Sequence, residues 1–544
     1  MLRRSAQLST LAWSRLSQPG VSIAKVPKPW RTAHATPGRE AAGLVVAKKL
    51  VGDDVLRAAC VEIAKLRFDR DADSVDGSPT FEVSWVRQGK YCHSGLARVF
   101  KQTIEEKLTP LIRSVSHLHG MADSRGLVLC DALVRSYDEG QRRQHPAHYD
   151  SQALVTAVLE VDMGCGGFEG PGFYVQPDAH VSSRLPITMS SGDVIAHSFD
   201  LQHGVEVHSG RRCSVIFWFA DSSASCASGA QPWYHAAASC GDADAQYNLS
   251  CHYVQQADAA RAVSAADVGT WIVADHQTAP TAPAKLLPLR AQELMRASAV
   301  QGHFLAQLAH GIMLVHAEME ARGVSDHASL LRSYRASGED FFRSEVYLES
   351  ERWIRSSADR GYYRAMVHLH SRRLEQAEHV AGLVQSAGRQ VHGQVEPVEA
   401  IEMASQQAAH TAEALQWLTR AAEQRADPAT MYALAVAHRD GSYGCTTVDV
   451  ATARHWFKAA AKMGHPPSQF EMGKLGGPEA EKWLQLASHH GVGDSSRALA
   501  LLYARRGEAT KLMRLFSGCV GRLLQGSSKV SAAALPHIPL AGGV

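Results

Sequence analysis

Hydrophobic and polar positions change their spacing several times between residues 41 and 225. In residues 53–66 and 98–115, apolar side chains recur three and four positions apart, which predicts two amphipathic helices. Other segments are short and rich in Val, Ile, Phe and Tyr, and Gly, Ser and Asp clusters separate them, which predicts strands and turns. The predicted strands are residues 126–137, 151–161, 172–177 and 212–219. Strands at this spacing predict a β-sandwich or barrel with flanking helices.

A different, Ala-rich pattern begins near residue 231. Trp233 and Trp353 each have an Ala five, a Gly eight and an Ala twelve positions later. Trp456 has the first two of these, and Trp417 has Arg425 at the Gly position. We interpret each copy as a helix, a Gly turn and a second helix that packs closely through its Ala. This frame resembles the Sel-one-like, tetratricopeptide-like repeat, and weaker copies lie at residues 294–310 and 483–499.

These patterns divide the 544-residue chain into four parts. We expect residues 1–40 to be a transit peptide or a disordered tail, and residues 41–225 to be an α+β domain. Residues 231–510 are expected to be an all-α solenoid with insertions, and residues 511–544 a C-terminal tail. The repeat Trp residues are expected to pack in the solenoid core rather than form a recognition surface.

Composition and charge argue against two classes of partner. The formal net charge is only +2 with 20% charged residues, so the sequence has no electrostatic signature of nucleic-acid binding. No apolar run reaches the roughly 18 residues of a membrane-spanning helix. The ten cysteines have no C-x-x-C pair or regular spacing, which is typical of reduced, intracellular thiols rather than a zinc site or a disulfide framework.

The N-terminal segment differs from the rest in composition. Residues 1–39 contain seven Arg or Lys residues and no acidic residue. The Ser-rich start, MLRRSAQLSTLAWSRL, can form a short basic amphipathic helix and lacks the apolar core of a secretory signal. This composition predicts import into a mitochondrion or another organelle. A disordered basic tail on a cytoplasmic protein is the alternative.

Candidate chemistry begins in RRQHPAHYDSQALVTAVLEV, residues 142–161, where His148 and Asp150 lie two positions apart. On a strand these two side chains share a face and can reach one metal ion, while Tyr149 points away. His203 supplies a third donor 53 positions after Asp150, and a strand bearing Arg212 follows it. Two His and one carboxylate form the facial triad of non-haem Fe(II) oxygenases, which leaves coordination positions open.

Residues 41–222 resemble the catalytic core of the 2-oxoglutarate/Fe(II)-dependent dioxygenases, in particular the prolyl 4-hydroxylase-like branch. The family pattern H-x-D…H…R is matched by His148, Asp150, His203 and Arg212. The segments RSYDEG, TAVLEV, GGFEGPGFYV, SSGDVIAH and SGRRCSVIFWF are similar as well. The resemblance implies a double-stranded β-helix (jelly-roll) catalytic domain followed by the helical repeats.

The same resemblance implies a set of site residues. The iron ligands would be His148, Asp150 and His203. Arg212 would pair with the distal carboxylate of 2-oxoglutarate, Ser214 would contact the same carboxylate, and Tyr137 would hydrogen-bond the co-substrate. Oxygen is the second co-substrate, succinate the product, and ascorbate a family expectation. An Asp rather than Gly or Ala at position 150 favours hydroxylation over halogenation.

Several residues compete for these assignments. His197 and His208 are alternatives to His203, but the distance in sequence from His203 to Arg212 fits the family pattern best. Arg211 is the alternative to Arg212, which shares a strand face with Ser214. We expect His145 to be a surface loop histidine, with a role in supporting the ligands as the alternative.

The sequence therefore predicts an enzyme, a 2-oxoglutarate-dependent dioxygenase that hydroxylates a peptidyl proline or another protein side chain. The repeats would recruit a protein partner or substrate, because repeat arrays offer extended surfaces. The alternatives are a non-catalytic scaffold or sensor with a degenerate oxygenase domain, and a small-molecule oxygenase.

Overall fold

The computed structural model describes residues 11, 13–15, 20–28, 30, 41–71, 73, 75, 79–114, 126–138, 142–164, 166–266, 287–390, 397–445 and 447–515. The chain divides into two compact units, Met1–Ala426 and Asp427–Val544. The first unit therefore contains both the sheets and the first repeat helices. The domain boundary predicted near residues 225–231 falls inside this unit and stays a prediction.

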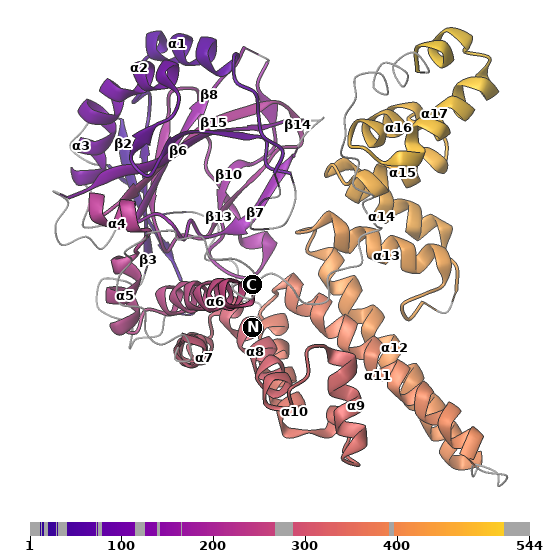
Figure 1. Cartoon of the computed structure of the whole chain (residues 1–544). Helices are drawn as coiled ribbons and strands as arrows, with labels where there is room; N and C mark the ends of the chain where they lie inside the picture. The colour runs from indigo at the N-terminus through magenta and orange to yellow at the C-terminus, as the bar shows by residue number, and fades with distance from the viewer. Residues whose placement is uncertain are drawn as a thin grey trace. The chain divides into compact units, whose positions relative to one another are not determined.

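Two antiparallel sheets make up the N-terminal part of the first unit (Figure 1). The larger sheet has the order β1-β2-β3-β12-β8-β15-β6-β4-β5. Its strands are β1 (Trp13–Arg15), β2 (Val21–Pro27), β3 (Ala41–Ala47), β4 (Glu82–Arg87), β5 (Lys90–Tyr91), β6 (Val128–Tyr137), β8 (Val155–Val161), β12 (Val194–Ser198) and β15 (Arg212–Ala220). The smaller sheet has the order β11-β10-β13-β7 and contains β7 (Gln144–His148), β10 (Gly172–Val175), β11 (Leu185–Pro186) and β13 (His203–Glu206). A two-stranded ribbon pairs β9 (Phe168–Glu169) with β14 (Ser209–Gly210).

The strand order identifies a double-stranded β-helix. Eight strands from β6 to β15 build the two main sheets, and they alternate between the sheets along the chain except that β10 and β11 both lie in the smaller one. We number these eight strands in chain order, leaving out β9 and β14. In the larger sheet, the neighbouring strands are the first (β6), eighth (β15), third (β8) and sixth (β12). In the smaller sheet, they are the second (β7), seventh (β13), fourth (β10) and fifth (β11). This interleaving is that of a jelly roll made from two Greek keys. The predicted fold class, a jelly roll followed by helical repeats, is confirmed.

The two faces of the larger sheet are both buried, which explains why every residue of β8 is buried. Helices α1 (Asp53–Ile63), α2 (Ser94–Thr103) and α3 (Thr109–Ser114) cover one face (Figure 1). Their apolar side chains share a core with alternate residues of the sheet, among them Leu159 and Val215. The opposite residues, including Val158 and Ile216, face the space between the sheets, where Phe173 of the smaller sheet packs.

The segment predicted to be a transit peptide or tail contributes to this sheet where the structure describes it. Strand β2 pairs along its full length with β3, and Lys28 just beyond it is buried. Trp13–Arg15, inside the predicted basic helix, form strand β1 instead. Residues 1–10 and 31–40 lie outside the described residues, so organelle import stays a prediction.

The cysteines differ from the expectation of reduced thiols in one place. Cys130 of β6 and Cys226 of helix α4 (Ser223–Ser228) form a disulfide across 96 positions of sequence. The two residues lie far apart in sequence and in no recognisable spacing, so only the fold brings them together.

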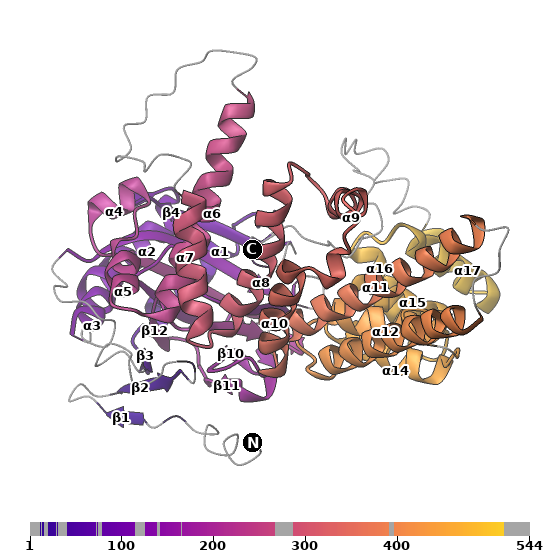
Figure 2. The same ribbon diagram turned by 90° about the horizontal axis from the view of Figure 1, so that it is seen from below.

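The predicted repeats are helix–turn–helix units in all six copies. The helices are α5 (Pro232–Ser239), α6 (Ala243–Ala266), α7 (Leu287–Val300), α8 (Phe304–Ala321), α9 (His327–Ala336), α10 (Glu345–Asp359), α11 (Tyr363–Gln390), α12 (Pro397–Glu423), α13 (Pro428–Asp440), α14 (Val450–Lys462), α15 (Pro466–Lys474), α16 (Ala480–His489) and α17 (Gly493–Arg506) (Figures 1 and 2). The turn position has a positive φ in every copy, for example +84° at Gly241 and +88° at Gly464. Arg425 holds the same left-handed conformation with φ +52°, so it is a strained substitute for Gly.

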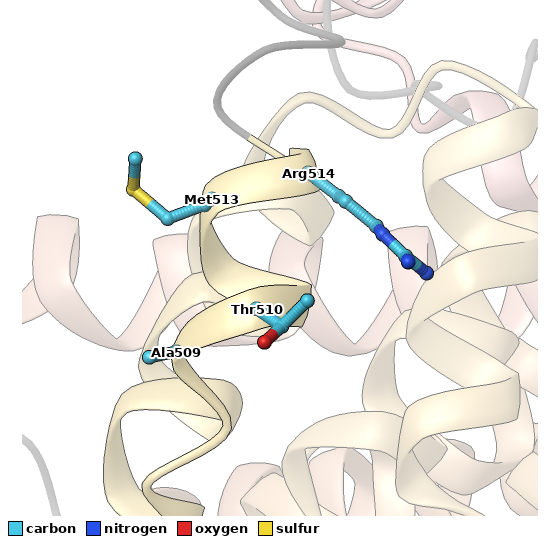
Figure 3. A pocket seen from close by; sticks show the side chains of 4 residues that line it. All are labelled: Ala509, Thr510, Met513 and Arg514. Atoms are coloured by element: carbon cyan, nitrogen blue, oxygen red, sulfur yellow. The ribbon is translucent and has the colours of Figure 1, made fainter.

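The second unit contains the last repeats and a surface hollow. Ala509, Thr510, Met513 and Arg514 line a depression of about 520 Å³ on the terminal helical turns (Figure 3). It contains none of the predicted site residues. Residues 511–515 are helical, and the remainder of the predicted C-terminal tail lies outside the described residues. Among the residues that the structure describes, no helix is long and apolar enough to cross a membrane.

Candidate metal centre

Neighbouring strands of the smaller sheet bring the predicted ligands together. His148 ends β7 and His203 begins β13, and the two are direct partners in the antiparallel register. Asp150 follows β7 by two residues, and its Oδ1 lies 3.4 Å from His148 Nε2. Its Oδ2 lies 3.5 Å from His203 Nε2. A metal ion bound about 2.1 Å from each donor separates adjacent donors by about 3 Å, so this cluster has the dimensions of a metal site.

His148 is oriented by a chain of hydrogen bonds that begins at Asp73. Asp73 Oδ2 accepts a hydrogen bond from His145 Nε2 at 3.0 Å, and His145 Nδ1 lies 2.9 Å from His148 Nδ1. His148 Nδ1 also lies 2.9 Å from the carbonyl of Pro146. With the proton of His145 on Nε2, His148 donates from Nδ1 and keeps the lone pair of Nε2 for a metal.

His145 was expected to be a surface histidine, and that expectation is wrong. Its exposed fraction is 2%, and it lies between Asp73 and His148. Burial first, and then the electrostatic effect of the neighbouring His148 ring, lower the pKa of His145 well below its usual range. A neutral His145 can accept at Nδ1, which is what the orientation of His148 requires.

The other two ligands are also held by neighbouring groups. His203 Nδ1 lies 3.2 Å from the carbonyl of Leu201, which leaves Nε2 directed at Asp150. The ring of His203 stacks on Phe173, with centroids 5.3 Å apart. Asp150 Oδ2 accepts a hydrogen bond of 2.7 Å from the Thr156 hydroxyl on β8. Such supporting contacts fix the direction of ligand lone pairs.

His197, the rival third ligand, lies beside the cluster. Its Nδ1 lies 3.1 Å from the carbonyl of Ser198, and its ring centroid lies 4.2 Å from that of His203. Its Nε2 lies 3.9 Å from Asp150 Oδ2 and has no hydrogen-bond partner among the described residues. The cluster with metal-binding dimensions consists of His148, Asp150 and His203. His208, the other rival, is largely exposed and binds Glu206.

Electrostatics of the cluster suit a divalent cation. Burial on its own raises the pKa of Asp150, but His203, His148 and His197 together lower it well below its usual range. Burial lowers the pKa of His203 well below its usual range and lowers that of His197 as well. The site therefore presents an ionised Asp150 carboxylate and a neutral His203 imidazole, the forms that bind metals.

The predicted co-substrate residues lie on adjacent strands. Arg212 of β15 and Tyr137 of β6 are direct partners in the register, and the guanidinium carbon lies 5.9 Å from the tyrosine ring centroid. Ser214 lies two residues further along β15 and is buried. Arg212 is 1% exposed, whereas Arg211 is only partly buried and binds Ser136. The alternation of the strand therefore directs Arg212, not Arg211, into the interior.

Three residues near the site were not predicted from the sequence. Thr156 and Glu160 share the interior face of β8, where Thr156 binds Asp150 and Glu160 binds Arg212 through a 2.7 Å contact between Oε2 and Nη2. Their alternation along a predicted strand is a signal that could have found them. Asp73 follows helix α1 in an irregular segment, and no pattern in the sequence links it to His148.

Comparison with known proteins finds two similarities, one to the Sel1 repeat and one to 2OG-Fe(II) oxygenases. Residues 411–425 and 428–465 match the family model of the Sel1 repeat. No curated protein matches the chain. A 2OG-Fe(II) oxygenase family oxidoreductase from Burkholderia pseudomallei has 14% identity and a TM-score of 0.27, and the match covers 33% of this chain and 85% of that one.

Two further solved structures are similar to different parts of the chain. A prolyl-4-hydroxylase from Pseudomonas putida has 17% identity and a TM-score of 0.23, over 33% of this chain and 92% of that one. A Sel1 repeat protein from Oxalobacter formigenes has 20% identity and a TM-score of 0.23, over 40% of this chain and 70% of that one. At these identities and scores the matches carry no information on substrate. The chain thus carries Sel1 repeats, and the solved structures similar to it include 2OG-Fe(II) oxygenases.

Proposed function

We propose that this protein is an Fe(II)- and 2-oxoglutarate-dependent dioxygenase that hydroxylates a peptidyl proline or another protein side chain. The observation that carries the proposal is the convergence of His148, Asp150 and His203 in one cluster, in which His148 is half-buried and the other two are buried. Two imidazoles and one carboxylate are the donor set of non-haem Fe(II) oxygenases. Bound iron would supply the oxidative chemistry, in which 2-oxoglutarate loses CO2 and becomes succinate.

The residues of the chain bind and orient the reactants. Asp73 and His145 hold His148 with Nε2 directed at the site, and Thr156 holds the carboxylate of Asp150. The guanidinium of Arg212 has two buried nitrogens, Nε and Nη1, with no hydrogen-bond partner among the described residues. These donors suit the distal carboxylate of 2-oxoglutarate, because a planar guanidinium binds a carboxylate through paired hydrogen bonds.

The proposed substrate is a protein, and the proposed role of the repeats is to recruit it. Stacked helical repeats expose extended surfaces that suit a protein partner. The first repeats belong to the same compact unit as the jelly roll, so a bound partner would be held near the site. We also propose import into an organelle, on the strength of the basic, acid-free N-terminal segment.

Succinate release tests the activity. In the presence of Fe(II), 2-oxoglutarate and air, the purified wild type is expected to form succinate faster than the His203→Ala variant, which loses a metal ligand. His208→Ala is the matched control, because His208 is an exposed histidine that lies outside the ligand cluster. Equal succinate formation by wild type and His203→Ala, with no binding of 2-oxoglutarate to either, would contradict the proposal and favour the scaffold alternative.

A further inference from the structure

Arg212 already has a carboxylate partner within the protein. Its Nη2 donates a 2.7 Å hydrogen bond to Glu160 Oε2, and both side chains are buried, with exposed fractions of 1% for Arg212 and 6% for Glu160. The two lie on neighbouring strands, because Glu160 of β8 is the register partner of Ser214 on β15. Glu160 therefore already accepts a hydrogen bond from one nitrogen of the guanidinium that is proposed to bind the distal carboxylate of 2-oxoglutarate.

The same guanidinium has unused donors. Nε and Nη1 of Arg212 are buried without a hydrogen-bond partner in the described part of the chain. Leaving a buried donor unpaired is destabilising. The rings of Tyr137 and Phe168 border the group, each with its centroid 5.9 Å from the guanidinium carbon, and neither supplies an acceptor there. The unpaired donors point to an anionic ligand that binds beside Glu160.

The charges around Glu160 determine what a second carboxylate would encounter. Among the described residues, Arg212 is the one cation that contacts Glu160, while Asp193 and Asp162 are acidic neighbours. Asp193 is itself paired with Lys48 at 2.9 Å, and Cys213 of β15 is neutral because burial raises its pKa to about 12. With Glu160 ionised, a bound dicarboxylate would leave two carboxylates to share one buried guanidinium, which is electrostatically unfavourable.

We propose that Glu160 gates the carboxylate subsite at Arg212, so that a dicarboxylate co-substrate binds together with one proton taken up by Glu160. This inference rests on the proposed function, since it takes the ligand to be 2-oxoglutarate. Protonation removes the competing charge and converts Glu160 into a hydrogen-bond donor toward the incoming carboxylate. Burial, together with Asp193 and Asp162, raises the pKa of Glu160 despite Arg212, so the proton is less costly here than at an exposed Glu.

The test is the pH dependence of 2-oxoglutarate affinity, measured by calorimetry on the Mn(II)-loaded full chain in two buffers of different ionisation enthalpy. Because binding takes up a proton, Kd is expected to rise with pH by about tenfold per unit once Glu160 ionises in the free protein. Proton uptake should approach one proton per bound 2-oxoglutarate in the pH range where Glu160 is ionised in the free protein. Glu160→Gln, which keeps the shape without the charge, should bind more tightly at high pH, with no uptake.

Oxalate is the control ligand, because it chelates a metal through two adjacent oxygens but has no distal carboxylate. The affinity for oxalate reports any pH dependence of the metal site itself. This affinity should change with pH by the same amount in wild type and Glu160→Gln. A wild-type Kd for 2-oxoglutarate that follows the oxalate profile, with no proton uptake, would overturn the gate whether or not the variant folds. Failure of both ligands to bind the metal-loaded wild type at any pH would instead count against the proposed function.

Discussion

At the residue scale, the metal cluster depends on contacts that hold each ligand in one orientation. Asp150 is the most dependent of the three, because it follows the end of β7 and is not held by strand hydrogen bonds. The Thr156 hydroxyl fixes its Oδ2 from the neighbouring sheet at 2.7 Å. The hydroxyl thus links the larger sheet to a ligand that belongs to the smaller one.

Thr156→Val is expected to weaken metal binding. Valine fills the same buried space but cannot donate to Asp150, and loss of a supporting hydrogen bond costs about 10–100-fold in metal affinity. The measurement is the Mn(II) dissociation constant of the purified variant. Thr156→Ser, which restores the hydroxyl, should regain most of the affinity, whereas equal weakening in both variants would point to packing rather than to the hydrogen bond.

Arg425→Gly is expected to stabilise the repeats. Arg425 is exposed and takes φ +52° at a turn where the other copies have Gly. Relief of left-handed strain, less the added flexibility of the unfolded chain, should raise the free energy of unfolding by about 0.5–1 kcal/mol. Denaturant unfolding measures it, with Arg425→Ala as control, because alanine retains the β-carbon and should give no comparable gain.

At this scale the sequence predicts the residues whose spacing is imposed by chemistry. His148 and Asp150 are two positions apart because both must reach one ion, and Arg212 is distinguished from Arg211 by strand alternation. His145 was placed wrongly because a histidine in a loop is usually exposed, and burial here depends on Asp73. The alternation of Glu160 with Thr156 marks a strand face, but the partner of Glu160 depends on pairing between β8 and β15.

At the element scale, a buried polar cluster joins the metal-bearing strand to the first repeat. We call it the hub, and it consists of Lys28, Tyr149, Asp200, Asp244 and His303. Tyr149, between the two ligands, points away from the metal cluster, and its hydroxyl donates to Asp244 Oδ1 at 2.6 Å. Lys28 Nζ lies 2.9 Å from Asp244 Oδ2 and 3.2 Å from Asp200 Oδ2. The hub therefore ties β2, the end of β7 and helix α6 together.

Asp244→Asn is expected to lower the stability of the first unit. The side chain of Asp244 is fully buried, and asparagine can still accept from Tyr149 but gives Lys28 an uncharged amide in place of a carboxylate. Breaking a buried ion pair costs about 3–5 kcal/mol. Urea unfolding followed by tryptophan fluorescence measures the loss. Glu293→Gln, an exposed acid on helix α7 of the same repeats, is the control and should change stability little.

Element types were predictable because the periodicity of apolar residues changes from two to about 3.6 at the junction of sheets and repeats. The hub was not predictable, because Lys28 lies in a segment whose composition predicts a targeting peptide. The two carboxylates that pair with Lys28 are more than 170 positions away in the sequence. Composition describes the average of the segment, whereas burial of one lysine depends on two distant carboxylates. The disulfide between Cys130 and Cys226 escaped prediction for the same reason.

At the scale of the whole molecule, the jelly roll supplies the metal cluster and the repeats supply surface. Ala179, just beyond the strands of the smaller sheet, shares an apolar core with Phe304 and Ile354 of the helices. Gly361, in the turn before α11, lies so close to His180 that an added β-carbon would approach its ring to 2.3 Å. The first repeats are therefore packed against the jelly roll rather than joined to it by a linker alone.

The most direct test of the metal centre is the iron content of the anaerobically loaded full chain. Wild type and His208→Ala should each bind one Fe(II) per chain, and His203→Ala should lose it while circular dichroism shows an intact fold. His197→Phe should keep its iron, because His197 lies outside the ligand cluster. Iron retained by His203→Ala and lost by His197→Phe, or no stoichiometric iron in wild type, would contradict the assignment of His148, Asp150 and His203 as the metal centre.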